Sequence, residues 1–384
     1  MGGVNLFADL TGEGSISETA RTTASALTRR GIALTYNEML LPYAMYRNAI
    51  IEYPTELPTG IVHRTNLFCY NLNLFSRLPS DWLARVCAKR HTIALWVWEM
   101  PVVPELWHGA FNKVDEVWCP SRFVQKSFQT ATRKPVVIVP HPVELLPRTQ
   151  PRAMFGLEEG RTVILCSFSA GSGEGRKNPW AVIEAYERAF GASPSRDKPL
   201  LVMKIQHSRQ YPKLVGALAE SLDRVRGHMI TATYSRQDMH NLYYSADCYA
   251  SLHRAEGFGL GLAEAMAAGK PVIATAYSGP CDYLTEQNGY PVNYQIRPVA
   301  ESDKPREAHP EHPIISATRS SAQYYRPGMT WAEADIDHAA AQMVSVYEHP
   351  DAAREKGARA ARDIRDHCDP NTVGAIMQSR IRTK

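Results

Sequence analysis

The sequence predicts an α/β protein made of two doubly wound, Rossmann-like domains. Short apolar runs typical of buried strands alternate with helical stretches in both halves of the chain, a pattern that favours parallel sheets covered by helices. Between the halves, the segment 141–148 (HPVELLPR) loses this periodicity and holds two prolines, as a linker does. With 384 residues, the chain is long enough for two hydrophobic cores.

In the first half, we expect the strands 4–10, 32–36, 66–74, 92–98, 116–119 and 136–140, and the helices 18–30, 80–89, 106–112 and one opening at 120–123. The loop after the first strand carries Gly12 and Gly14 and opens on a helix N-terminus. It matches the dinucleotide-binding fingerprint only weakly, since Ser17 stands where a third glycine is expected. A plain strand-to-helix turn remains an alternative for this loop.

In the second half, we expect the strands 162–168, 200–206, 229–233, 248–252 and 271–275, and the helices 180–190, 239–245, 338–347 and 370–384, with a further helix from Leu260 to just before Gly269. We expect Asp238 to cap the helix 239–245 and Asn178 to start the helix 180–190. The segment 296–328 holds five prolines, so we expect an irregular excursion over the surface without clear chemistry.

Composition narrows the class of protein. A hydrophobic fraction of 44% and a charged fraction of 21% are those of an ordinary globular protein. The formal net charge of +4 suits an anionic small molecule or an anionic membrane surface and does not indicate nucleic acid. Seven scattered cysteines without a C-x-x-C pair indicate reduced thiols. Without a signal peptide or an apolar run of roughly 18 residues, we expect a cytoplasmic protein, soluble or peripheral at the membrane.

The stretch 251–275 (SLHRAEGFGLGLAEAMAAGKPVIAT) combines two acids with a glycine loop and a helix start. Seven residues separate Glu256 from Glu264, and Gly257, Phe258 and Gly259 precede the helix that begins near Leu260. The glycines allow a close backbone approach to a ligand, and the N–H groups of a helix N-terminus attract phosphate. Glu264 leans back toward that end, where a carboxylate can accept hydrogen bonds from sugar hydroxyls. Two ordinary solvated glutamates are the alternative.

A pair of cations precedes the helix 180–190. Arg176 and Lys177 follow a loop of small residues, 169–175, and two adjacent cations before a helix N-terminus favour a pyrophosphate. A solvated basic turn is the alternative.

The spacing of Glu256 and Glu264 resembles the E-x7-E signature of the family 4 retaining glycosyltransferases, which have the GT-B fold. The resemblance covers most of the chain and is strongest from Ser167 to Thr275. It implies two domains that face each other across a cleft. It also implies transfer of a hexose-type sugar from a nucleotide diphosphate sugar, UDP or GDP, to a hydroxyl acceptor with retention of configuration. The expected acceptor is a glycan or lipid-linked saccharide of bacterial surface polysaccharide synthesis.

The resemblance also implies roles for individual residues. Glu256, Lys177 and Arg176 would form the catalytic group. The expected donor-binding residues are Glu264, Gly257, Phe258, Gly259, Leu260, Tyr234, His253 and Ser278, and the expected acceptor-side residues are Gly12, Gly14 and Glu99. Trp98 replaces a histidine that the family often carries, so Glu99 is the remaining contact at that position, with a turn cap as the alternative. A structural role for His253 is equally open.

No metal or other cofactor is expected. Asp335 and Asp337 resemble the D-x-D metal motif of the other large glycosyltransferase fold, but they stand at a helix start, where acids serve the helix dipole. The leaving diphosphate would instead be stabilised by Lys177, Arg176 and the helix N-terminus after Gly259. Lys177 is the safer of the two cation assignments, because many members of the family carry the Arg some residues before the Lys.

We expect residues 1–147 to be the acceptor-side domain, 148–367 the nucleotide-sugar donor domain, and 368–384 a helix that crosses back to the first domain. Two other functions remain open: a nucleotide-sugar epimerase of the same fold, and a catalytically silent protein that binds a sugar nucleotide.

Overall fold

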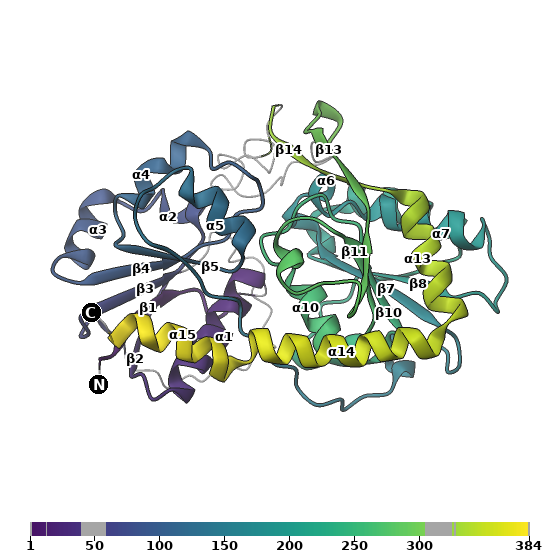
Figure 1. Ribbon diagram of the computed structural model, residues 1–384, viewed down its shortest axis with the longest axis horizontal. Coiled ribbons are helices and arrows are strands. Elements are labelled where there is room, and N and C mark those ends of the chain that lie inside the picture. The colour runs from purple at the N-terminus through teal and green to yellow at the C-terminus, as the bar shows by residue number, and fades with distance from the viewer. Residues whose placement is uncertain (1, 13, 40–58, 304–324, 326–327, 383–384) are drawn as a thin grey trace. The chain divides into compact units, whose positions relative to one another are not determined.

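The computed structural model describes residues 2–12, 14–39, 59–303, 325 and 328–382. The chain divides into two compact units. Unit 1 comprises Met1–Glu144 and Asp366–Lys384, and unit 2 comprises Leu145–Arg365 (Figure 1). Each unit holds a six-stranded parallel sheet with helices packed on it. The predicted α/β class with two Rossmann-like, doubly wound sheets is therefore confirmed.

Unit 1 has the strand order β2-β1-β3-β4-β5-β6. Its strands are β1 (Val4–Ala8), β2 (Leu34–Glu38), β3 (Thr65–Cys69), β4 (His91–Leu95), β5 (Glu116–Cys119) and β6 (Val136–Ile138). Its helices are α1 (Ser15–Arg29), α2 (Leu72–Phe75), α3 (Ser80–Cys87), α4 (His108–Phe111), α5 (Arg122–Gln129) and α15 (Pro370–Arg382). Val373 and Met377 of α15 are fully buried in the same core as Leu27 of α1, so the last helix is an integral part of unit 1.

Unit 2 has the strand order β12-β11-β10-β7-β8-β9. Its strands are β7 (Val163–Ser169), β8 (Leu200–Gln206), β9 (His228–Ile230), β10 (Cys248–Ser251), β11 (Val272–Thr275) and β12 (Tyr290–Val292), with a separate antiparallel pair of β13 (Tyr294–Pro298) and β14 (Thr330–Ala334). Its helices are α6 (Glu174–Lys177), α7 (Pro179–Phe190), α8 (Pro212–Arg224), α9 (Arg236–Ser245), α10 (Leu260–Ala267), α13 (Ile336–Glu348) and most of α14 (Pro350–Cys368).

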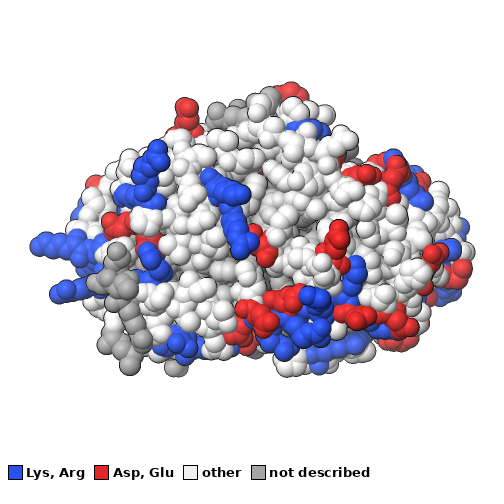
Figure 2. Space-filling model, viewed as in Figure 1, with Lys and Arg blue, Asp and Glu red and all other residues white. Residues whose placement is uncertain are grey.

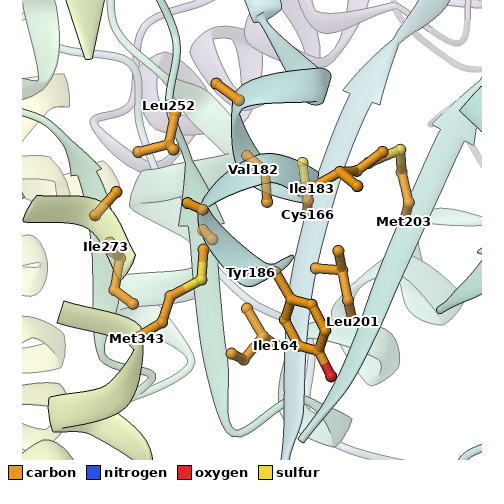
Figure 3. Close-up of a cluster of buried hydrophobic side chains, with 14 of the residues drawn as sticks. Ile164, Cys166, Val182, Ile183, Tyr186, Leu201, Met203, Leu252, Ile273 and Met343 are labelled. Carbon is orange, nitrogen blue, oxygen red and sulfur yellow. The ribbon is translucent and has the colours of Figure 1, made fainter. Parts of the chain in front are cut away.

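The core of unit 2 lies between its sheet and the helices α7 and α13. Figure 3 shows Tyr186 of α7 and Met343 of α13 directed at side chains of the central strands, among them Ile164 and Leu201. All four of these side chains are fully buried. This packing fixes the strands of the sheet, and with them the loops at their carboxyl ends, where open α/β sheets bind ligands.

Helix α14 contrasts with these core elements. Figure 2 shows red and blue atoms intermixed along the region where Figure 1 places this helix. Its sequence carries both signs of charge: Asp351, Arg354, Glu355, Lys356, Arg359, Arg362, Asp363, Arg365 and Asp366. Ala353, Ala360 and Ile364 form its buried stripe. The helix is therefore amphipathic, with a solvated face of balanced charge.

Several local predictions were wrong. The predicted strand 66–74 ends at Cys69, because the side chain of Asn71 accepts a hydrogen bond from Leu72 N and starts α2. Ser235, not Asp238, caps α9, since its hydroxyl accepts from the Asp238 backbone N–H at 3.1 Å. The prediction that Asn178 starts α7 is confirmed, since it is the N-cap residue before Pro179, although its backbone is left-handed with φ of 51° and its side chain makes no capping hydrogen bond.

The segment 296–328 was expected to be irregular. Its first residues instead belong to β13, which pairs with β14, while 304–324 and 326–327 lie outside the described residues.

Candidate functional site

The loop between β10 and α10 places Glu256 beside both predicted cations. The Glu256 carboxylate forms an ion pair with Lys177 through Oε1, and its Oε2 lies 3.2 Å from Nη1 of Arg176. Burial by itself would raise the pKa of Glu256, but the positive charges of Lys177 and Arg176 hold it well below its usual range. Glu256 is therefore a buried, fully ionised carboxylate at neutral pH.

The two cations occupy different environments. Only 4% of the Arg176 side chain is exposed, against 21% for Lys177. The Arg176 guanidinium also donates to the carbonyl oxygens of Ala255 at 2.8 Å and Ser172 at 3.1 Å. Arg176 thus fastens the loop before Glu256, and Lys177 is the cation with more access to solvent. Both lie within α6, a short helix that the sequence analysis did not predict.

A second loop, after β11, supports Glu256 from its backbone side. The Glu256 N–H donates to Oγ of Ser278 at 2.8 Å, and the Gly279 N–H donates to the Glu256 carbonyl at 2.9 Å. A Cβ atom at Gly279 would lie 2.2 Å from the carbonyl oxygen of Gly257, so only glycine permits this approach. Ser278 is therefore bound to the loop that carries Glu256.

His253 lies beneath this loop and is completely buried. Its Nε2 is 3.3 Å from the Tyr277 carbonyl oxygen, and its Nδ1 is 3.3 Å from Oγ of Ser251. Burial is the main cause that lowers its pKa. A neutral imidazole therefore joins the carboxyl ends of β10 and β11.

The turn into α10 is shaped for glycine. Gly259 has φ of +85°, and a Cβ atom there would lie 2.9 Å from Oη of Tyr283 and 3.0 Å from Pro280. The Tyr283 hydroxyl lies 2.7 Å from the Phe258 carbonyl and 3.0 Å from the Gly259 carbonyl. The turn is thereby held in place, and Leu260 begins the helix whose first N–H groups have no partner within it.

Glu264, in the second turn of α10, faces His240 of α9. Oε1 of Glu264 lies 3.9 Å from Nε2 of His240. The Leu146 N–H donates to Nδ1 of His240 at 2.8 Å, so the single proton of the neutral ring sits on Nε2, toward Glu264. The Tyr243 hydroxyl is a further hydrogen-bonding neighbour of Glu264. The carboxylate is therefore oriented by side chains of α9.

The loop between β9 and α9 carries Tyr234, which is half-buried. Its ring packs edge-on against Phe155, with centroids 5.5 Å apart, and Nζ of Lys204 lies 5.1 Å from its centre. Lys204 is buried in β8. Sequence reasoning missed Lys204 and its neighbour His207, whose Nδ1 is 2.8 Å from Oγ of Ser169. The available signal was a single lysine in an otherwise apolar strand that ends at a ligand-binding edge.

The predicted acceptor-side residues all lie in unit 1. The Gly12 N–H donates to Oδ1 of Asp9 at 3.0 Å, and Asp9 is buried. Gly14 is the N-cap residue of α1, and Glu99 is a half-buried residue beyond the end of β4. These positions follow the carboxyl ends of β1 and β4, on the same edge of the sheet. Asp9, which orders this loop, was not singled out in the sequence.

The D-x-D pair does not form a metal cluster. Asp335 caps α13 by accepting from the His338 N–H at 3.0 Å, and Asp337 pairs with Arg188 on the surface. Within the described parts of the chain, no group of three or more His, Cys, Asp or Glu side chains is arranged to hold a metal ion.

No described helix combines the length and the apolar character that a bilayer crossing requires.

The chain, with its two six-stranded parallel sheets, has the GT-B fold. Residues 156–295 match the family model for glycosyl transferases group 1, so the chain carries a group 1 glycosyltransferase domain that includes Lys177, Glu256 and Glu264. The match confirms the predicted family 4 type for this domain and the prediction of a glycosyltransferase enzyme.

Solved structures show the same fold at low sequence identity. Anabaena HepE in complex with UDP-glucose is 12% identical, with both chains covered completely and a TM-score of 0.67. Sucrose-phosphate synthase from Thermosynechococcus elongatus is 15% identical, with 100% of this chain and 99% of that chain covered and a TM-score of 0.67. S. aureus TarM, in a complex that contains UDP, is 11% identical over 83% of this chain and 55% of that chain, with a TM-score of 0.56. No curated protein sequence matches the chain at a significant level.

Proposed function

We propose that the protein transfers a hexose-type sugar from a UDP-sugar to a hydroxyl acceptor with retention of configuration. The observation that carries the proposal is the ionised Glu256, held by Lys177 and Arg176 next to the N-terminus of α10. The crystallised complexes of HepE with UDP-glucose and of TarM with UDP support UDP as the nucleotide.

The proposed chemistry centres on the leaving diphosphate. Negative charge grows on this group as the bond to the sugar breaks, and preorganised donors stabilise such charge most strongly where water is excluded. Lys177 and the first N–H groups of α10 supply these donors. Arg176 keeps Glu256 and the loop in place, since its guanidinium is almost fully buried among their oxygens.

Donor recognition is assigned to Glu256, to Glu264 and to the turn before α10. Glu256 and the backbone of Phe258 and Gly259 face the sugar, while Glu264 accepts from the ribose hydroxyls. Tyr234 lies in the loop after β9, where we place the base. Ser278 acts through the backbone N–H of Glu256, and His253 ties the start of the Glu256 loop to the carbonyl of Tyr277.

The acceptor is assigned to unit 1, through Gly12, Gly14 and Glu99. We propose a glycan or a lipid-linked saccharide of surface polysaccharide synthesis, used by a cytoplasmic enzyme at the membrane face. The resemblance to family 4 enzymes and the formal net charge of +4 support this choice.

A thermal-shift screen of UDP-, GDP-, ADP- and TDP-glucose tests the donor. UDP-glucose is expected to raise the melting temperature most, because a ligand that binds only the folded state stabilises it. If none of the four raises it, the donor site is refuted. Release of UDP from the donor that binds, with and without candidate saccharides, then tests transfer. Conversion of the donor alone into its epimer would establish an epimerase, and binding without any release would establish a silent binding protein.

A further inference from the structure

A network of four charged side chains lies next to α6, outside the predicted site. It joins Arg254, Arg297, Asp303 and Glu333. The Glu333 carboxylate accepts from Nε of Arg254 at 2.8 Å, from Nη2 of Arg254 at 3.0 Å and from Nε of Arg297 at 2.5 Å. Asp303 accepts from both terminal nitrogens of Arg297 at 2.7 Å. Two positive and two negative groups thus neutralise one another.

An aromatic ring completes the network. Trp331 of β14 is 1% exposed, and the guanidinium carbons of Arg254 and Arg297 lie 5.5 and 5.6 Å from its centre. Such stacking suits arginine, whose planar group can bind a carboxylate and an aromatic face together. The side chains are therefore fixed in position as well as paired.

Three hydrogen bonds join Arg254 and Glu333 to α6 and its C-cap residue Asn178, two through side chains of the network and one through the backbone of Arg254. Nη1 of Arg254 donates to the Gly175 carbonyl at 2.6 Å, the Arg254 N–H donates to the Arg176 carbonyl at 2.8 Å, and Nδ2 of Asn178 donates to Glu333 at 3.2 Å. A Cβ atom at Gly175 would lie only 2.2 Å from the Asp303 carbonyl oxygen. The backbone of α6 is therefore pressed directly against the network.

Helix α6 has no apolar side chain of its own. Its sequence is Glu174-Gly175-Arg176-Lys177, and its buried members are Glu174 and Arg176. A four-residue helix without an apolar face is not stable by itself. Its position, and hence that of Lys177, depends on polar contacts, several of which come from Arg254 and Glu333.

We propose that Arg254 and Glu333 are positioning residues for the donor diphosphate: they hold α6 so that Lys177 is directed at the leaving group. The inference rests on the proposed function, in which Lys177 contacts the diphosphate. Arg254 and Glu333 themselves contact protein groups only in this scheme. Because β14 supplies Glu333 and β13 supplies Arg297, the small antiparallel sheet serves the donor site from outside the six-stranded sheet.

The test compares the binding of UDP and UMP by calorimetry, because only UDP carries the second phosphate. Glu333→Gln keeps the shape of the side chain and removes its charge. We expect UDP to bind at least about tenfold more weakly, the loss typical of a hydrogen bond to a charged group, while the affinity for UMP changes less than about twofold. Arg254→Lys keeps the charge and loses the planar fork, so it should show the same selective loss.

A double-mutant cycle separates positioning from general destabilisation. Once Lys177→Ala has removed the cation, adding Glu333→Gln should weaken UDP binding no further, because its effect passes through Lys177. Glu158→Gln is the matched control: it removes a surface ion pair with Arg196 in the same unit, away from α6. It should leave both nucleotides unaffected.

The outcomes are distinct. If wild-type protein binds neither nucleotide, the proposed function fails, and the inference fails with it. If wild type binds UDP but both variants bind it as tightly, or if UDP and UMP binding fall equally, the inference alone is overturned. Should Glu333→Gln fail to fold, as judged by circular dichroism, Arg254→Lys decides the question alone.

Discussion

Neighbouring residues of one short helix can have separate tasks, as Arg176 and Lys177 do. Arg176 donates hydrogen bonds to two carbonyl groups, forms an ion pair with Glu256, and is almost fully buried. Lys177 has Glu256 as its ion-pair partner, with a fifth of its side chain exposed. A compact ammonium on a flexible stem can redistribute its hydrogen bonds when an anion arrives, which a guanidinium locked into several acceptors does not do easily.

Lys177→Ala is therefore expected to lower kcat by about a hundred- to a thousandfold, as loss of one preorganised donor to a developing charge does. Steady-state kinetics with saturating donor measures the change. Lys213→Ala, at an exposed position of α8, is the control and should retain wild-type turnover. A Lys177→Ala enzyme with unchanged kcat would contradict the role in diphosphate departure.

Glu264→Ala is expected to raise the KM for the donor by about ten- to a hundredfold, because it removes a charged acceptor for ribose hydroxyls. The effect should be larger on KM than on kcat, since ribose is bound equally in the ground state and the transition state. The diagnostic comparison uses 2′-deoxy- and 3′-deoxy-ribose donors. If Glu264 binds ribose, the ratio of the KM values of variant and wild type should be smaller with at least one of these deoxy donors than with the natural donor. A ratio that is equally large with both deoxy donors would refute the assignment.

At the scale of elements, the turn before α10 combines an unusual backbone with a crowded site. Gly259→Ala should destabilise the protein by about 1–2 kcal/mol for the left-handed backbone, with an added loss of donor affinity because Cβ would displace Tyr283 or Pro280. Urea unfolding and donor titration measure the two effects. Gly160→Ala has a similar φ of +78° with open space around it, so it should share the first effect and lack the second. Equal donor affinity in both variants would show that the turn is not part of the site.

The cap of α13 gives a test of metal independence. Asp335→Ala should cost about 1 kcal/mol of stability, the usual value of an N-cap, and leave the transfer rate unchanged. Full activity in excess chelator is expected for both proteins. Activity that requires Mg²⁺ or Mn²⁺ and is lost in the variant would instead make Asp335 and Asp337 metal ligands.

Elements were predictable from the sequence where local patterns decide them. The apolar run of β8 was placed at its observed bounds, and α10 begins at Leu260 and stops before a left-handed Gly269, as its composition indicates. Helix α6 was not predictable, because a sequence with glycine and two cations has no helical periodicity. It forms through contacts with residues about 80 to 160 positions away in the chain.

In the candidate site, too, some features follow from local sequence and others depend on contacts between distant parts of the chain. The acids, the glycine turn and Lys177 follow from spacing and residue type, which the sequence displays directly. The burial of Arg176 and the hydrogen bond from the Glu256 N–H to Ser278 depend on how separate strands bring their loops together. The pairing of β13 with β14 joins segments more than 30 residues apart, and no local sequence pattern predicts it.

At the scale of the whole molecule, buried histidines link stability to pH. Burial is the main cause that lowers the pKa of His207 to about 4 and the pKa values of His141 and His240 to about 3, from an ordinary value of 6.5. His141 belongs to unit 1 and the other two to unit 2, so both units carry such groups. In the folded protein, these side chains stay neutral at mildly acidic pH.

The sign of the effect follows from proton binding. As pH falls below about 6.5, the unfolded chain takes up protons on these histidines, while the folded chain takes up none until pH about 4 or 3. The free energy of unfolding must therefore fall with pH in this window. Each histidine accounts for about 2 kcal/mol between neutral pH and pH 5.0, so urea midpoints should drop steeply over that range. In His207→Gln, the loss of unfolding free energy between neutral pH and pH 5.0 should be smaller than in wild type by about 2 kcal/mol. His349→Gln, at an exposed position, should show the same loss as wild type. A wild-type protein equally stable at pH 7.5 and 5.0 would mean that these histidines are protonated in the folded state, and so that their side chains are not enclosed as the structure has them.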